Sequence, residues 1–240
     1  MKKIKKSSEL LWLFGIIFVA LGVAICSKAN LGVSMIAAPA FVLHESLSGV
    51  FSWLTVGVTE YIIQGILLLV LCLLVRRFNW RFLLTFAVAV LYGYVLDLFI
   101  WILGGVSLNE VWLRWAMLIL GDLITAFGVA CFFRTYMPLQ VYELFVSETA
   151  DKFSFKISRA KWTFDLSLLV VSLVFALTLF GDVSSFDFST IGYSSFHSIG
   201  LGTLVTTAIN SPLISLMGKF IDKFFDSTPA FPSLEQKIKR

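Results

Sequence analysis

Residues 10–27 read LLWLFGIIFVALGVAICS, a run of 18 residues without a charged side chain. A helix that crosses the hydrocarbon core of a bilayer needs about 20 mostly apolar residues, because each adds about 1.5 Å of length. The run therefore predicts a transmembrane helix. A basic start before an apolar run is also typical of a signal peptide, but a segment of the same pattern recurs in mid-chain, where a signal peptide cannot lie.

The composition extends this pattern to the whole chain. Of 240 residues, 58% are hydrophobic and only 14% are charged, and the mean hydropathy is +0.91. A soluble domain carries roughly 25% charged residues, so this chain lacks the polar surface that water requires, and the lipid bilayer is its expected partner. Cys26, Cys72 and Cys131 lie in apolar runs without metal-ligand spacing and are expected to be free thiols.

Six stretches are long and apolar enough to span a membrane. They are Leu10–Ser27, Trp53–Val75, Phe82–Leu103, Trp112–Phe133, Trp162–Phe180 and Ile199–Ile221. The ten-residue alternation of a membrane β-barrel is absent from the sequence, so all six are expected to be helices. The predicted fold class is an all-α polytopic membrane protein with six transmembrane helices.

The basic residues predict the orientation of these helices. Of the 19 Lys and Arg residues, all but Lys28 and Arg114 fall in the N-terminal segment, the second and fourth loops and the C-terminal segment. Because positive loops stay in the cytoplasm, both termini are predicted to be cytoplasmic. The expected location is the bacterial cytoplasmic (inner) membrane.

The sequence also contains an internal repeat. A shift of 106 residues lays Gly15 on Gly121, Gly22-Val23-Ala24 on Gly128-Val129-Ala130 and Lys28 on Arg134. Farther along the shift becomes 118 residues, and Thr85 and Gly93 match Thr203 and Ser211. We predict a duplicated three-helix unit, with repeats at residues 1–105 and 106–225 and a cytoplasmic tail at 226–240. Because three spans are an odd number, the two repeats are inverted, which is typical of secondary transporters. A symmetric bundle or a channel is the alternative.

Each repeat is predicted to contain an interrupted segment after its first helix. Segments 31–43 and 137–147 are apolar but too short to span, and Gly32 and Pro138, which both break helices, occupy the same repeat position. Such segments are re-entrant or interfacial. Broken helices at matching positions of two halves indicate a transporter's binding site.

The chain resembles the YczE/YyaS/YitT-like family of bacterial integral membrane proteins. The resemblance rests on the following residues: Ala29–Ser34 with its Ala-x-Leu-Gly-x-Ser pattern, Glu143, Arg159 with Asp165, Gly202-Thr203, and Asn210-Ser211-Pro212-Leu213-Ile214. The sequence departs from the family at Met35-Ile36-Ala37, where Pro-Trp-Asp is frequent, and at Pro138, where glycine is usual. The resemblance implies a presumed transport protein and names no substrate.

Polar residues within apolar spans are candidates for function, because an ionised group in the bilayer is costly. The predicted substrate or ion site consists of Glu60, Gln64, Asp122, Asn210, Asn30, Gln140 and Glu143. Asp97 and Asp165 lie nearer the membrane surfaces and are expected to be solvated or to pair with Lys28 and Arg159. No Lys or Arg lies within the six predicted cores, so the interior is expected to be net acidic, which suits proton coupling or a cationic or amine-bearing solute.

These features favour a small-solute secondary transporter over other functional classes. The alternative is a non-transporting membrane partner, such as an assembly factor or the solute-binding subunit of a larger complex. The sequence carries no catalytic, metal-binding or cofactor-binding motif that would indicate an enzyme. Its scattered basic residues do not indicate nucleic acid. The expected partners are the bilayer and a small-molecule or ion substrate, and a homo-oligomer is left open.

Overall fold

The computed structural model describes residues 4–76, 78–180 and 197–228. This part of the chain contains eight α-helices, one 3₁₀ turn and two short strands. The elements are β1 (Ile4–Ser7), α1 (Ser8–Ala29), α2 (Ala38–Leu47), α3 (Val56–Val75), α4 (Trp80–Ile102), η1 (Leu103–Gly105), α5 (Val111–Phe132), α6 (Val141–Phe153), α7 (Ile157–Phe180), α8 (Leu201–Phe224) and β2 (Phe225–Thr228).

Six of these helices, α1, α3, α4, α5, α7 and α8, are long and apolar enough to cross a membrane, which confirms the six predicted spans. The chain is therefore a multi-pass integral membrane protein. The main difference lies in α7, which begins at Ile157 and not at Trp162. The first turns of α7 carry Arg159 and Lys161. Because these side chains are charged, the hydropathy of the sequence placed the first turns in a loop.

The ends of the helices follow from local hydrogen bonding. Thr55 caps α3 by accepting a bond from the Val58 amide, at 3.2 Å. Asp97 of α4 reinforces this end, because its carboxylate accepts bonds from the Gly57 amide, at 2.7 Å, and from the Thr55 hydroxyl, at 2.5 Å. An acceptor at a helix N-terminus satisfies amides that lack a partner within the helix. Asp97 therefore caps α3, and the expected pairing with Lys28 is wrong.

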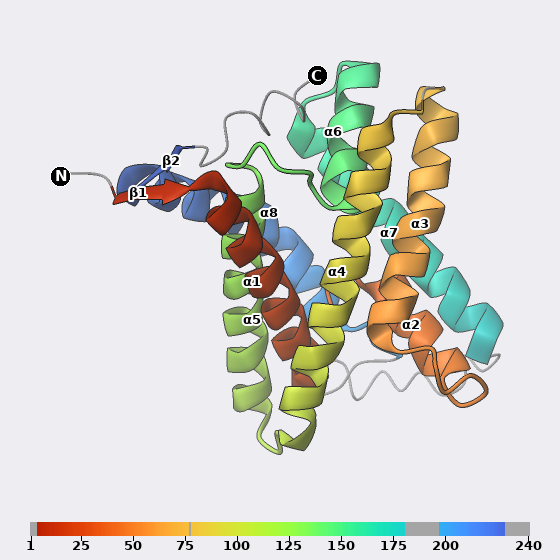
Figure 1. The fold of residues 1–240 in the computed structure, drawn as a ribbon. Coiled ribbons are helices and arrows are strands. Elements are labelled where there is room, and N and C mark those ends of the chain that lie inside the picture. The colour runs from red at the N-terminus through yellow and green to blue at the C-terminus, as the bar shows by residue number, and fades with distance from the viewer. Residues whose placement is uncertain (1–3, 77, 181–196, 229–240) are drawn as a thin grey trace.

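Helices α1 and α5 cross in an antiparallel pair whose backbones touch (Figure 1). A Cβ on Gly22 would lie 2.5 Å from the Gly121 carbonyl, and a Cβ on Gly128 would lie 2.9 Å from the Gly15 carbonyl. In the 106-residue register Gly15 corresponds to Gly121 and Gly22 to Gly128. The two contacts thus exchange partners, which is the pattern that a two-fold axis between two helices produces.

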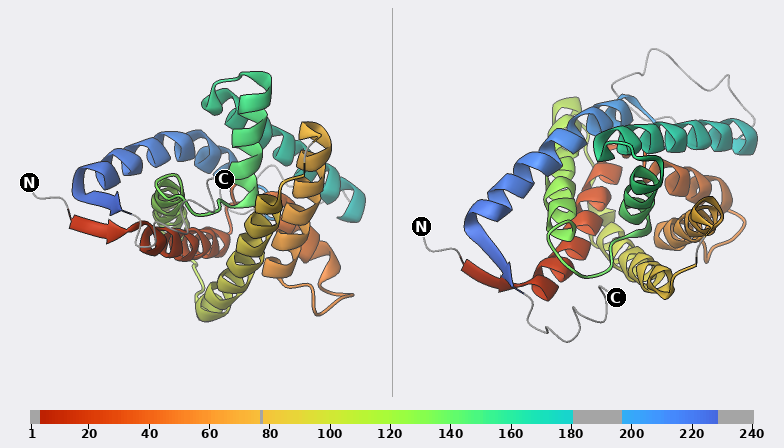
Figure 2. Two further views of the ribbon diagram at one scale, coloured as in Figure 1. Left: turned by 45° about the horizontal axis from the view of Figure 1, so that its top comes forward. Right: turned by 90° about the horizontal axis from the view of Figure 1, so that it is seen from above.

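Several of the remaining contacts show the same exchange of partners, whereas within the described residues the close packing of α3 on α4 has no equivalent of similar extent between α7 and α8. α4 packs on α1 as α8 packs on α5, α2 contacts α3 as α6 contacts α7, and α2 meets α7 as α6 meets α3. Figure 2 shows α8 on one side of the α1 and α5 pair and α3 with α4 on the other.

The interrupted segments contain the short helices α2 and α6, and both helices bury side chains within the bundle. We call the side that carries the α3–α4 connection and α6 the terminal face, because α1 begins and α8 ends on it, and the opposite side the far face (Figure 1). At the margin of the bundle β1 and β2 pair in parallel, with Ile4 opposite Phe225 and Ser7 opposite Thr228. This ribbon is a small addition to the all-α fold.

Candidate functional site

A small cavity of about 40 Å³, which we call the central cavity, lies between the two halves of the bundle. It has room for a few water molecules, since one water needs about 10–15 Å³ by the same kind of measure. Its charged and amide side chains come from four elements: Glu60 on α3, Gln140 and Glu143 at the start of α6, Lys161 on α7 and Asn210 on α8.

The lining of the central cavity follows the internal repeat. Most of its residues form pairs at equivalent positions of the two halves. At the 106-residue register these pairs are Val19 with Thr125, Val23 with Val129, Ser34 with Gln140, Ile36 with Tyr142 and Ala37 with Glu143, and at the 118-residue register of the later helices Tyr92 pairs with Asn210. The central cavity therefore lies at the interface between the two repeats, where equivalent segments of each face one another.

Glu60 is the most enclosed acid of the cavity. Its side chain is 0% exposed, and its Oε2 atom accepts a hydrogen bond of 2.8 Å from the Tyr142 hydroxyl. Its Oε1 atom has no hydrogen-bond partner among the described residues. Tyr142 thus fixes one carboxylate oxygen, and the Gln64 side chain one turn along α3 lies close enough to interact with the carboxylate, although no hydrogen bond of ordinary geometry joins them. Sequence reasoning missed Tyr142, because only the packing of α6 on α3 brings it to Glu60.

Glu143 lies one residue farther along α6, which is not one of the six spans. Burial raises the pKa of its carboxyl to about 7, and its own backbone amide and the Lys161 ammonium limit the rise. Its Oε2 atom also lacks a hydrogen-bond partner within the described residues, as does Nε2 of Gln140. A carboxyl group with a pKa close to neutral exchanges its proton readily in the physiological range.

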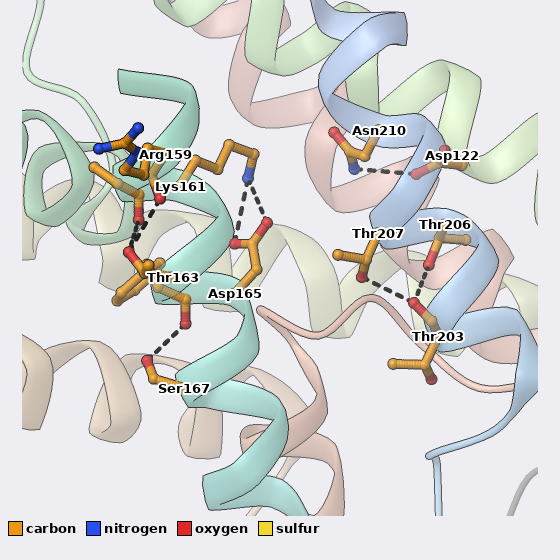
Figure 3. A network of polar contacts seen from close by, with 12 residues as sticks. Asp122, Arg159, Lys161, Thr163, Asp165, Ser167, Thr203, Thr206, Thr207 and Asn210 are labelled. Carbon is orange, nitrogen blue, oxygen red and sulfur yellow. Dashed lines mark hydrogen bonds and ion pairs between the residues drawn. The ribbon is translucent and has the colours of Figure 1, made fainter. Parts of the chain in front are cut away.

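Lys161 corrects the prediction that no basic residue enters the spans. Its ammonium lines the central cavity and forms an ion pair with Asp165, 3.3 Å away and one turn along α7 (Figure 3). Arg159 is not the partner of Asp165, because a spacing of six residues places the two on different faces of the helix, whereas a spacing of four places them on one. One cation therefore accompanies the acids.

Asp122 and Asn210 join α5 to α8. The Asn210 amide donates a bond of 3.0 Å to Asp122 Oδ1 (Figure 3), while Asp122 Oδ2 and Asn210 Oδ1 have no partner in the described part of the chain. Asn210 lines the cavity and Asp122 does not, although it is only 2% exposed. Asp122 therefore supports the cavity through Asn210.

Two predicted site residues lie outside the central cavity. Gln64 is fully buried one turn beyond Glu60, and neither of its side-chain polar atoms has a hydrogen-bond partner among the described residues. Asn30, at the end of α1 with φ of 52°, lines a separate pocket of about 220 Å³ on the far face, together with Lys28 and His44. This far pocket shares no lining residue with the central cavity.

The far face is closed by backbone contacts next to Gly32, whose φ is +105°. The Val33 amide donates to the Ser198 carbonyl at 3.0 Å, and the Gly202 amide donates to the Leu31 carbonyl at 2.9 Å. A Cβ on Gly202 would lie 2.7 Å from that carbonyl. Within the described residues no backbone hydrogen bond joins the equivalent segment, 137–139, to α4.

On the terminal face the central cavity continues into a second space of about 210 Å³, which we call the vestibule. The two share six lining residues, namely Ile36, Val129, Tyr142, Glu143, Lys161 and Ile214. The vestibule extends to the ends of α5 and α7 at Phe133 and Ile157. Within the described residues, the site is therefore continuous with a space on the terminal face and shares no lining with the pocket on the far face.

Among the described residues no group of three His, Cys, Asp or Glu side chains is arranged to hold a metal ion. Residues 6–219 match a family described as "Family of unknown function (DUF6198)". Comparisons with curated proteins and with solved structures find no match.

Proposed function

The chain belongs to DUF6198, a family of unknown function, and from its own residues we propose that it is a secondary transporter, coupled to protons, of a small cationic or amine-bearing solute. The observation that carries this proposal is the central cavity. It is lined by equivalent positions of two halves and holds buried polar atoms that lack partners in the described residues. In transporters built from inverted repeats the substrate binds at the interface of the repeats.

The unequal closure of the two faces supports the same function. Segment 31–33 is bonded to Ser198 and Gly202 at the start of α8, and its counterpart 137–139 makes no such bond to α4 within the described residues. Exchange of these two arrangements between the halves would close the terminal face and open the far one. That exchange is the alternating access of a transporter, and the resemblance to YczE/YyaS/YitT-like proteins agrees with it.

The acids favour a positively charged solute. Glu60, Asp122 and Glu143 have no ion-pair partner within the described residues, and Lys161 is paired with Asp165. A buried acid without a cation takes up either a proton or a cationic solute. A carboxyl group that binds a proton and the cationic solute in turn couples the transport of one to that of the other. Glu143, with its pKa of about 7, is suited to this exchange.

Transport by the purified protein alone tests the proposal. We would reconstitute it in liposomes, impose a pH gradient and record currents on solid-supported membranes for primary amines, guanidines and inorganic cations. Glu60→Gln should abolish the current, whereas the matched variant Glu148→Gln, on α6 but outside the cavity and the vestibule, should retain it. A silent protein that copurifies with another subunit would replace the proposal with the non-transporting partner.

The inverted orientation has its own test. In a variant without the native cysteines, Phe78→Cys lies at the α3–α4 connection and Gly104→Cys at the α4–α5 connection. An impermeant maleimide added to whole cells should label only the second, because the terminal face is proposed to be cytoplasmic. Labelling of Phe78→Cys from outside would contradict this orientation.

A further inference from the structure

The polar atoms without partners around the central cavity are mostly acceptors. Glu60 Oε1, Glu143 Oε2 and Asn210 Oδ1 are buried and make no hydrogen bond within the described residues, and Asp122 Oδ2, behind Asn210, is in the same condition. The only donor of this kind in the lining is Gln140 Nε2. A ligand that fits this set must therefore bring several donors.

An unsatisfied buried acceptor is costly, so the free energy of binding depends on how many of these oxygens the ligand reaches. A quaternary ammonium has positive charge but no N–H group, and it would leave all three lining acceptors without a bond. A primary ammonium has three N–H donors and a guanidinium five. Either head group brings both the positive charge and enough N–H donors for the three lining acceptors.

An inorganic cation fits the cavity less well. A bound metal ion needs several oxygens within about 2.0–2.6 Å of a single point, and the acids of the described residues are not gathered closely enough to form such a group. Much of the remaining lining is apolar, for example Val23, Val129 and Ile214. Such walls suit the carbon atoms of an organic ligand.

We propose that the central cavity selects the N–H-bearing charged end of a small organic cation, a primary ammonium or a guanidinium, whose N–H groups are accepted by Glu60, Glu143 and Asn210. This inference rests on the proposed function, because it assigns a substrate class to the same site. The remainder of the ligand extends into the vestibule, which is lined largely by apolar side chains such as Phe133, Val146 and Phe164.

A matched pair of probes tests the head group. Phenethylamine and its N,N,N-trimethyl derivative carry the same charge near pH 7 and the same phenethyl group, and they differ at the head group, where three methyl groups replace the three N–H donors. Each would be titrated against the purified full-length protein in lipid nanodiscs, with binding measured by calorimetry and by the melting temperature, which a ligand of the native state raises. The primary ammonium should bind at least tenfold more tightly, and phenylguanidine should bind in the same range.

Variants separate this inference from the proposed function. Glu60→Gln and Glu143→Gln should each weaken the primary ammonium at least tenfold, while Glu148→Gln should not, and each variant is first checked for monodisperse elution. If the trimethyl derivative binds as tightly as phenethylamine or more tightly, and Glu60→Gln abolishes this binding, the head-group assignment is overturned. The central cavity would then remain the proposed binding site. Binding that neither cavity variant changes, or no binding of any of the three probes, would overturn both the head-group assignment and the proposed function.

Discussion

Gly22→Ala probes the contact on which the arrangement of the two halves depends. The new Cβ would lie 2.5 Å from the Gly121 carbonyl oxygen and 2.6 Å from the Thr125 amide nitrogen, where ordinary contact begins at 3.4 Å. Both obstacles are backbone atoms that no rotamer can move. Helices α1 and α5 must therefore separate by most of an ångström along a contact that also contains Gly15.

The cost of this change can be approximated. Overpacking of a closely packed interior costs about 1–3 kcal/mol, and the backbone obstacle places Gly22→Ala at the upper end. The helix-forming preference of alanine returns about 0.5–1 kcal/mol. The net loss is about 2 kcal/mol of unfolding free energy.

Unfolding by sodium dodecyl sulfate in mixed micelles, followed by tryptophan fluorescence, measures this loss. Gly65→Ala is the matched control, because a Cβ there would meet only the ring of Phe86, at 3.2 Å, which has room to shift its end. It should be neutral or slightly stabilising. A Gly22→Ala protein as stable as the Gly65→Ala protein would refute the close backbone contact between α1 and α5.

Three further changes test separate parts of the structure. Burial raises the pKa of Glu143 from 4.5 to about 7, so its protonated form stabilises the fold fully below pH 4.5 and this contribution is lost as the pH rises through 7. Between pH 5 and 8 the melting temperature should fall more for the wild type than for Glu143→Gln, equivalent to about 2 kcal/mol, and parallel curves would contradict the shift. Asp97→Ala removes the carboxylate that reinforces the Thr55 cap of α3 and should cost about 1–2 kcal/mol in the same detergent titration, while the melting-temperature shift caused by phenethylamine is retained; unchanged stability would refute this reinforcement. Gly202→Ala presses on the Leu31 carbonyl and should speed labelling of Ser34→Cys by a maleimide from the far face, and an unchanged rate would show that this contact does not close that face.

The sequence predicted the six spans, and most of the polar residues that it singled out lie in or beside the central cavity; its failures have physical reasons. Hydropathy is a local property, so helices such as α1 and α5 could be recognised residue by residue. Lys161 was missed because the first turns of α7 are polar, which shifted the predicted span past it. The bond from Tyr142 to Glu60 joins residues 82 positions apart, and no local pattern encodes such a contact.

The repeat singled out two equivalent segments, and the structure places their polar residues differently. At the start of α6, Gln140 lines the central cavity. Asn30, beside the other segment, lies in the far pocket. The sequence treats the two halves as equivalent, whereas the structure holds them differently. Among the described residues, segment 31–33 is bonded through its backbone to Ser198 and Gly202, whereas in segment 137–139 the Pro138 carbonyl accepts a bond of 2.9 Å from the Trp12 side chain of α1.

Equivalent positions around the central cavity carry unlike side chains, and this gives the cavity a direction. Ala37 stands where the other half has Glu143, and Ser34 where it has Gln140, so the acid and the amide lie on the wall that α6 provides. In the proposed transporter, a solute bound to Glu143 and Gln140 would keep its charged end toward α6 whichever side of the membrane the cavity faces. It would pass through without turning end over end, with one end recognised throughout and the other left to vary.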